Sequence, residues 1–407
     1  MKFNRRNPKC YVAHIKCLTA MLIAYVLSLK WLKQKQSRPA VMMYSHSLSG
    51  NIKAFFDYTI EKVNLPYETY YATIDKQEYK KLSKVYGDRI LLGTRVSVAK
   101  KILNAGIMMT SHGPGVFYFL KWLSPNVKFV DVWHGLGFKK PPARAWKLYE
   151  FYSALFVSSE YVKETLYKKH FGFSDSRLIV TGYARTDKFC NQNGMACCVR
   201  KQLGLENTKY IILFAPTYRS RGESWEIPFG LSTRNFLKCL NELCENIDAI
   251  CIFRQHMNSK LRLFETGFPK IKIICQKDYP ETNNLLTAVD LVITDWSSIA
   301  CDFYALHRPV IYVDNPIPSY DLSEALPINR VGDHVKNFNE FALAVKKNLQ
   351  LGKDEIDEML SEVLDQCYGG TLDGYSSQRY DTAIKGLLHN NLLLEEQTLR
   401  FKKKAQV

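Results

Sequence analysis

The chain has 407 residues, of which 46% are hydrophobic, and its formal net charge is +17. This length suits two domains of average size, and the hydrophobic content excludes a globally disordered chain. The excess of Lys and Arg indicates an anionic partner, such as a nucleic acid, an anionic lipid or a phosphorylated substrate. Because the sequence has no zinc-finger spacing and no aromatic RNA-binding segment, we expect no nucleic-acid partner and favour a membrane surface.

The eleven cysteines are scattered along the chain, and no CxxC pair or metal-ligand spacing occurs among them. An odd number of cysteines in a large chain is typical of reduced thiols in the cytosol. We therefore expect neither a disulfide framework nor a bound metal.

Residues 1–37 form a basic leader with an apolar centre at Cys17–Leu29, and no acidic residue precedes Asp57. The apolar stretch is shorter than the about 20 residues that a spanning helix needs. We predict an interfacial helix whose lysines contact anionic headgroups, which places the protein peripherally at the cytoplasmic face of the cell membrane. A signal-anchor that spans the bilayer and a helix that packs on the protein are the alternatives.

Residues 38–200 predict a first α/β domain, because short apolar runs alternate with helical patterns. The expected strands are Val41–Tyr44, Tyr67–Tyr71, Ile90–Leu92, Ile107–Thr110, Lys128–Trp133, Ala154–Val157 and Leu178–Val180.

Residues 205–380 repeat this plan as a second domain, after a linker within Asn191–Asn207. The expected strands are Tyr210–Phe214, Ala249–Phe253, Ile271–Cys275, Leu291–Thr294 and Val310–Val313. The polar insert Ser220–Phe229 is predicted to be a loop over the site, and residues 381–407 a C-terminal helix with a basic tail. The fold class is therefore α/β, with two Rossmann-like, doubly wound domains that face each other across a cleft.

The segment Asp290–Asp314 predicts a phosphate-binding turn. An apolar strand ends at Thr294, Asp295-Trp296-Ser297-Ser298 breaks the pattern, and a helix follows to about Leu306. Free N–H groups at the start of a helix attract phosphate, and the two serine hydroxyls add donors. An ordinary serine-capped turn is the alternative.

This segment resembles the TDYSS-containing segment of the CDP-glycerol glycerophosphotransferases, the family of teichoic-acid primases and polymerases. Four further segments agree with that family in order and spacing: Trp133-His134-Gly135, Gly182–Asp187, Phe214–Arg219 and Arg254-Gln255-His256. The resemblance covers roughly residues 40 to 380 and implies the two-domain GT-B fold.

The resemblance implies that His134 is the general base, and its place after an apolar strand agrees with that role. His256 follows a strand of the second domain and is expected to stabilise charge on the leaving phosphate. The family usually has Thr-Pro-Leu-Lys after the first motif and His-Pro at the second, whereas this chain has Leu136–Lys139 and His256-Met257.

The remaining candidate residues are divided between the two substrates. Guanidinium groups clamp phosphate oxygens, and hydroxyl or amide groups in loops after strands contact a polyol. The donor side is expected to use Arg219, Arg185, Thr294, Asp295, Ser297 and Ser298, and the acceptor side Ser49, Asn51, Lys139 and Asp187. The segment His112–Gly115 is a further candidate for the cleft, and His46 is expected to be structural or solvated.

These features predict the transfer of glycerol phosphate, or another polyol phosphate, from a CDP-activated donor to a hydroxyl of a lipid-linked or polymeric surface glycan. CMP would be released, and no cofactor or metal is expected, since no Asp-x-Asp pair is present. One alternative is a GT-B glycosyltransferase that uses a nucleotide sugar. Another is a non-catalytic protein that binds polyanions through its charge.

Overall fold

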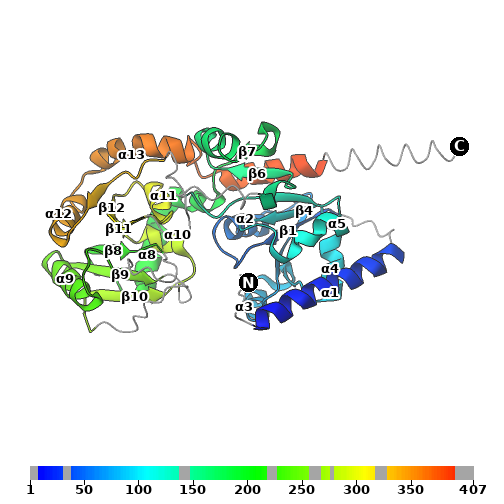
Figure 1. Cartoon of the computed structure of the whole chain (residues 1–407), viewed down its shortest axis with the longest axis horizontal. Coiled ribbons are helices and arrows are strands. Elements are labelled where there is room, and N and C mark those ends of the chain that lie inside the picture. Colours follow the sequence, from blue (N-terminus) through cyan, green and yellow to red (C-terminus); the bar gives the residue numbers. More distant parts are fainter. Residues whose placement is uncertain are drawn as a thin grey trace.

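A computed structural model of the chain describes residues 8–30, 38–136, 147–217, 227–255, 267–275, 279–316 and 328–389. Figure 1 shows two α/β units next to each other, each built around a parallel sheet. This arrangement confirms the predicted fold class.

The first unit contains a seven-stranded sheet in the order β3-β2-β1-β4-β5-β6-β7. Its strands are β1 (Ala40–Tyr44), β2 (Glu68–Thr73), β3 (Ile90–Leu92), β4 (Ile107–Thr110), β5 (Lys128–Asp131), β6 (Ala154–Val157) and β7 (Leu178–Val180). All neighbours pair in parallel, with Met42 opposite both Tyr70 and Met108. The strands are almost wholly buried, because helices cover both faces of a parallel sheet.

The helices of this unit are short and connect consecutive strands. They are α2 (Gly50–Glu61), α3 (Lys76–Tyr86), α4 (Val96–Leu103), α5 (Leu120–Leu123) and α7 (Glu160–Val162), with the short turns η1 (Gly87–Arg89), η2 (Gly115–Phe119), η3 (Lys147–Tyr149), η4 (Lys163–Lys168), η5 (Asp175–Arg177) and η6 (Ala184–Asn191).

The second unit contains a six-stranded parallel sheet in the order β10-β9-β8-β11-β12-β13. Its strands are β8 (Tyr210–Phe214), β9 (Ala249–Gln255), β10 (Ile271–Cys275), β11 (Leu291–Thr294), β12 (Val310–Val313) and β13 (Asp333–Val335). Its helices are α8 (Gln192–Leu203), α9 (Thr233–Asn246), α10 (Thr282–Thr287), α11 (Ile299–Tyr304), α12 (Phe338–Asn348) and α13 (Lys353–Tyr368). Helix α8 occupies the segment expected to be a linker, and the edge strand β13 was not expected.

Strand order reverses in the middle of both sheets. In the first, β1 lies between β2 and β4, and in the second, β8 lies between β9 and β11. Loops diverge at such a switch point and leave a crevice beyond the carboxyl ends of the strands. The fold therefore offers one crevice in each unit.

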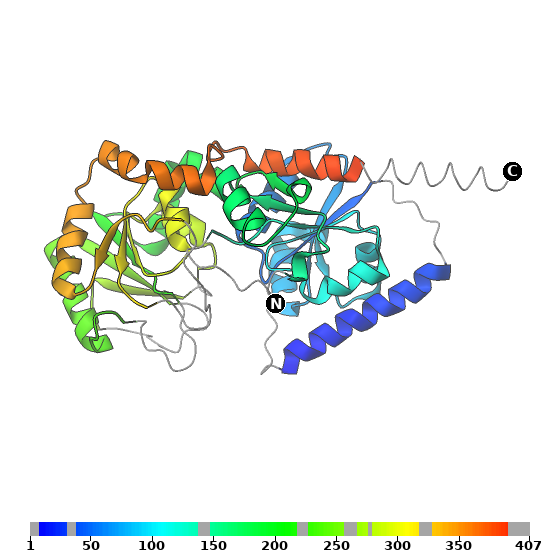
Figure 2. The same cartoon turned by 45° about the horizontal axis from the view of Figure 1, so that its top comes forward.

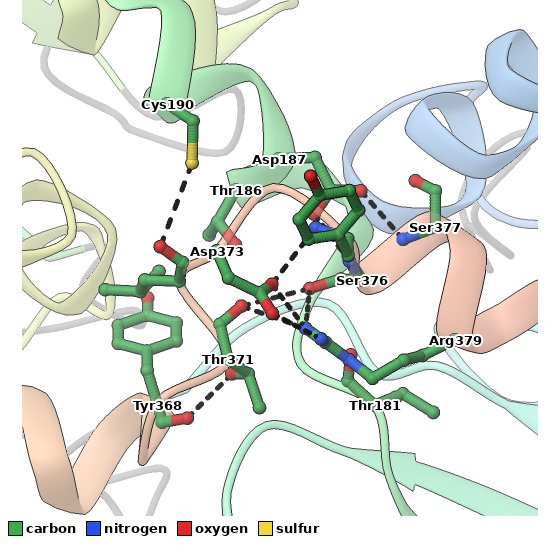
Figure 3. Close-up of polar contacts among 12 residues, drawn as sticks. Thr181, Thr186, Asp187, Cys190, Tyr368, Thr371, Asp373, Ser376, Ser377 and Arg379 are labelled. Atoms are coloured by element: carbon green, nitrogen blue, oxygen red, sulfur yellow. Dashed lines mark hydrogen bonds and ion pairs between the residues drawn. The ribbon is translucent and has the colours of Figure 1, made fainter.

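The chain returns to the first unit at its end. A helix over residues 376–389 begins earlier than expected and buries Tyr380, Ile384 and Leu388 in the core of the first sheet. Figure 3 shows how its start is held: the carboxylate of Asp187 accepts the backbone N–H groups of Ser376 and Ser377 at 2.9 and 2.7 Å. The return helix therefore ties the second unit to the first.

The apolar leader is part of a longer helix, α1 (Pro8–Lys30), which packs against α4 and η2. Figures 1 and 2 show α1 along the outside of the first unit, on the side away from the C-terminal helix. Cys17, Ala20, Met21 and Ala24 are buried in the core of this unit. Within the part of the chain that the structure describes, α1 is the one helix long and apolar enough to cross a membrane.

Candidate active site

A cavity of about 330 Å³ lies between the carboxyl ends of the two sheets. His134 of the first unit and Ser298 of the second both line it, as the sequence predicted. The lining residues come from both units: Ser49, Gly50, Asn51, Ser111, His112, His134, Arg185, Ala215, Pro216, Arg254, Pro280, Glu281, Thr282, Asn283, Ser297, Ser298, Ile299 and Asp302. Residues far apart in sequence therefore meet at one site.

A constrained turn after β5 presents His134 to the cavity. Trp133 has a φ of 45°, which is uncommon for a residue other than glycine, so β5 ends earlier than expected. The carboxylate of Asp131 accepts the Trp133 N–H at 2.8 Å and the Thr110 hydroxyl at 2.9 Å. Gly135 has a φ of 154°, and a Cβ there would lie 3.1 Å from Nη2 of Arg185. Buried hydrogen bonds thus fix the backbone on which His134 sits.

The hydrogen bond of the His134 ring identifies its tautomer. Its Nδ1 lies 3.0 Å from the carbonyl oxygen of Ser111. Since a carbonyl only accepts, Nδ1 carries the hydrogen, and Nε2 of the neutral ring has a lone pair that can accept a proton. This is the form that a general base requires.

Arg185 joins the two units instead of extending into solvent. Its Nε and Nη2 donate to Oδ1 of Asp302 at 3.0 and 2.7 Å, and its Nη1 donates to the carbonyl oxygen of His134 at 2.6 Å. Burial is the largest single effect on Arg185 and lowers its pKa, but the charge and hydrogen bond of Asp302, together with Tyr368 and Tyr183, outweigh it and raise the pKa. Burial also raises the pKa of Asp302, an effect that Arg185 reduces. The geometry of Arg185 thus fits a bridge between the units better than the predicted phosphate clamp.

The predicted phosphate-binding turn divides into a buried part and an open part. Thr294 donates to the carbonyl oxygen of Ala215 at 2.7 Å, and Asp295 accepts the Thr217 N–H at 2.8 Å. Both are fully buried and support the turn from behind. Ser297 and Ser298 line the cavity, and no hydrogen bond is seen from the Ser298 hydroxyl to another described residue.

Arg254 is a cavity residue that the sequence analysis did not select. Its Nη2 donates to the carbonyl oxygen of Tyr279 and to the hydroxyl of Thr282, both at 2.8 Å. Its Nη1 is buried without a hydrogen-bond partner among the described residues. Burial lowers the pKa of Arg254 to about 10. A buried cation at a cavity wall, with no carboxylate partner among the described residues, is suited to an anionic ligand. Its place near the carboxyl end of β9 was the available signal.

Glu281 is a second residue that the sequence analysis did not select. It lies at the start of α10 and lines the cavity. Burial raises the pKa of its carboxyl, and Lys53 and Lys188 of the first unit oppose this shift. A partly buried carboxylate at this wall can accept hydrogen bonds from substrate hydroxyl groups.

The acceptor-side candidates differ in their placement. Ser49 lines the cavity at the N-cap of α2. The side chain of Asn51 is occupied: it donates to the carbonyl oxygens of Val132 and Trp133 at 2.8 and 3.0 Å and accepts the Arg185 N–H at 3.2 Å. It therefore holds the His134 turn in place.

Asp187 is placed away from the predicted acceptor side. It lines a separate cavity of about 390 Å³ and caps the C-terminal helix.

Three predicted site residues, Lys139, Arg219 and His256, lie outside the described residues. Among the described residues, no group of three or more His, Cys, Asp and Glu side chains could hold a metal ion.

Comparisons with known proteins agree with this geometry. A family model described as CDP-glycerol:poly(glycerophosphate) glycerophosphotransferase matches residues 25–384. The teichoic acid ribitol-phosphate polymerase TarK of Staphylococcus aureus is 26% identical over 294 residues, which are 67% of this chain and 54% of TarK. The teichoic acid glycerol-phosphate primase of Bacillus subtilis is 26% identical over 226 residues, 50% of this chain and 54% of the primase. The chain thus spans about half the length of these relatives.

The fold also matches a solved structure. The wall teichoic acid polymerase TagF superposes with a TM-score of 0.69 at 17% sequence identity, over 94% of this chain and 99% of the TagF chain. This likeness concerns the fold, and it confirms the predicted GT-B arrangement.

The buried carboxyl of Asp131 gives a pH-dependent prediction. Burial raises its pKa from 3.8 to about 7, so between these values the folded protein holds a proton that the unfolded chain has lost. The free energy of unfolding of the wild-type protein therefore falls as the pH rises through this range. In Asp131→Asn the side chain does not titrate, so this fall in the free energy of unfolding is removed. We expect the melting temperature of Asp131→Asn, relative to wild type, to rise from about pH 5 to about pH 8 in thermal scans.

The matched control is Asp175→Asn, because Lys163 and Lys168 lower the pKa of this exposed carboxyl. That variant should show no such gain with pH. An Asp131→Asn difference in melting temperature that stays constant between the two pH values would contradict a raised pKa of Asp131 in the folded protein.

The bridge between Arg185 and Asp302 predicts energetic coupling between the units. Arg185→Met leaves a buried carboxylate without its partner, which typically costs about 3–5 kcal/mol. In Arg185→Met/Asp302→Leu the stranded charge is gone, so the loss in unfolding free energy should be smaller than the sum of the single losses. Urea unfolding followed by circular dichroism checks this. Strict additivity in the double-mutant cycle would show that the pair is not coupled.

Proposed function

Because the chain belongs to the CDP-glycerol:poly(glycerophosphate) glycerophosphotransferase family, we propose that it transfers a polyol phosphate from a CDP-activated donor to a hydroxyl group, releasing CMP. Glycerol phosphate is the first candidate, and ribitol phosphate the second. The acceptor is a lipid-linked or polymeric glycan of the teichoic acid type. The observation that carries the proposal is that His134 and Ser298, from different units, line one cavity.

In the proposed reaction, Nε2 of His134 takes the proton of the acceptor hydroxyl. The hydroxyl oxygen forms a bond to the β-phosphorus of the donor, and the bond from that phosphorus to the bridging oxygen breaks. CMP leaves with that oxygen. The Nδ1–H bond to Ser111 keeps the His134 ring oriented while it gains the proton.

The donor diphosphate is proposed to lie against the second unit. Ser297 and Ser298 offer hydroxyl donors, and Arg254 offers a buried cation with one N–H group directed to no described protein acceptor. Such preorganised donors stabilise charge where it develops during phosphoryl transfer. The resemblance adds His256 and Arg219 on the same side.

The membrane is the proposed location of the reaction. One face of α1 is buried against the first unit, whereas Ile15, Leu22, Val26 and Leu27 on its outside are each more than half exposed. A helix that spanned the bilayer would give up the buried contacts, so we favour a helix that lies in the interface with its outer apolar face in lipid. The positive net charge of +17 adds attraction to anionic headgroups.

Purified protein should release CMP from CDP-glycerol or CDP-ribitol in the presence of a lipid-linked acceptor, and mass spectrometry should show the added polyol phosphate. His134→Asn should lower turnover by about 10²- to 10⁴-fold, because the general base is lost. Arg254→Gln should mainly raise the KM for the donor, since it removes a contact to the diphosphate.

The control is His307→Asn, because His307 pairs with Asp357 on the surface of the second unit. That variant should keep wild-type turnover. Transfer from a nucleotide sugar with release of its nucleoside diphosphate would favour the glycosyltransferase alternative. Salt-dependent polyanion binding without turnover would favour the non-catalytic one.

The membrane proposal is tested by cosedimentation with vesicles that contain anionic lipid. The triple variant Ile15→Ser/Leu22→Ser/Val26→Ser should lose vesicle binding, while CMP release with a water-soluble acceptor is kept. Val63→Ser/Leu343→Ser is the control, because these residues are 83% and 68% exposed on other elements. Equal vesicle binding of all three proteins would contradict an interfacial role for α1.

A further inference from the structure

Three histidines follow three neighbouring strands of the first sheet. His46 comes shortly after β1, His112 after β4 and His134 after β5. The strands β1, β4 and β5 are adjacent in the sheet, and all run in the same direction. Their carboxyl ends therefore bring the three imidazole rings to one edge, at the switch point that borders the cavity.

The three rings form a continuous stack. The centroids of His112 and His134 lie 4.2 Å apart with an angle of 13° between the ring planes. The centroids of His46 and His112 lie 4.5 Å apart with an angle of 32°. His112 is thus enclosed between the other two rings. His112 and His134 line the cavity, whereas His46 supports the stack from behind.

Ser111 links the two rings that line the cavity. Its carbonyl oxygen accepts the Nδ1–H of His134 at 3.0 Å, and its hydroxyl lies 2.9 Å from Nδ1 of His112. Ser111 itself is buried at the end of β4. One rigid residue therefore determines the orientation of both rings.

Building on the proposed function, we propose that His112 is a positioning residue that holds the imidazole of His134 in the orientation needed to deprotonate the acceptor. His134 lines the cavity, and its Nδ1–H bond to Ser111 sets the position of one ring edge but does not by itself set the tilt of the ring plane. A parallel ring on one face prevents this tilt, because offset stacking is the preferred arrangement of such rings. Small errors in the position of a reacting group strongly reduce rate.

The stack favours positioning over two other roles. In nearly parallel rings the nitrogen atoms lie in separate planes and do not point at one another, which is unsuited to a direct proton transfer from His134 to His112. Face-to-face rings also cannot direct their nitrogens to one metal ion. The property that matters is therefore the flat ring of His112, not its ability to titrate.

Two substitutions at the same position separate ring shape from ring chemistry. His112→Ala removes the supporting ring, so kcat for CMP release should fall about 10- to 100-fold while the donor KM stays within about 2-fold. His112→Phe keeps a flat ring without nitrogens, and kcat should stay within about 3-fold of wild type. If His112→Phe is as slow as His112→Ala, or if His112→Ala is as fast as wild type, the proposal is overturned. His307→Asn serves as the control for loss of a histidine elsewhere.

A second measurement does not depend on turnover. In NMR spectra of protein labelled with ¹⁵N-histidine, His134 should show one rigid Nδ1–H tautomer in wild type and in His112→Phe. In His112→Ala the ring should show averaged tautomer signals. An unchanged His134 signal in a folded His112→Ala protein overturns the proposal. A wild-type protein that turns over no CDP-polyol, but shows these NMR differences, refutes the proposed function and leaves the positioning role supported.

Discussion

The buried contact of Arg185 with Asp302 is the interaction on which the site depends. Arg185 follows the last strand of the first sheet, and Asp302 lies on α11 of the second unit. The same guanidinium donates to the carbonyl oxygen of His134, so one side chain connects the turn that carries His134 with the helix that follows Ser298. A cation in this position is stable only while its carboxylate partner is present, and the arrangement of the two units is therefore narrowly defined.

Several buried polar side chains around the site form their hydrogen bonds mainly with backbone groups. Asp131, Asn51 and Asp295 each satisfy backbone N–H or C=O groups in the loops that carry the site. Loops lack the regular hydrogen bonds of helices and strands, so buried side chains must supply them. This explains why several polar residues next to the motifs are buried, while other polar residues, among them His134, Ser297 and Ser298, line the cavity.

The two ends of the described chain attach to opposite sides of the first unit. Helix α1 buries Cys17, Ala20, Met21 and Ala24 in the core of the unit and leaves branched apolar residues outside, whereas the helix over residues 376–389 buries its aromatic and apolar side chains in the opposite core. The first unit thus carries both the proposed membrane contact and the connection to the second unit.

Much of the framework could be predicted from the sequence, because a parallel strand buried on both faces is a continuous apolar run. Strands such as β3, β6 and β11 have the predicted bounds, and their carboxyl ends located His134, Ser297 and Ser298. β13 was not predicted because Asp333 and His334 interrupt the apolar pattern at this sheet edge. The order of the five motifs also indicated the family.

The partners of the polar side chains were decided only by the tertiary structure. The sequence marked Arg185 as a phosphate ligand and His46 as structural or solvated, and it did not select Arg254. In the folded chain Arg185 is paired with Asp302, His46 joins a stack with His112 and His134, and Arg254 reaches the cavity. A residue type limits which hydrogen bonds and charges a side chain can offer. Which group meets it depends on packing between segments far apart in the chain, and local sequence patterns carry no information about that packing.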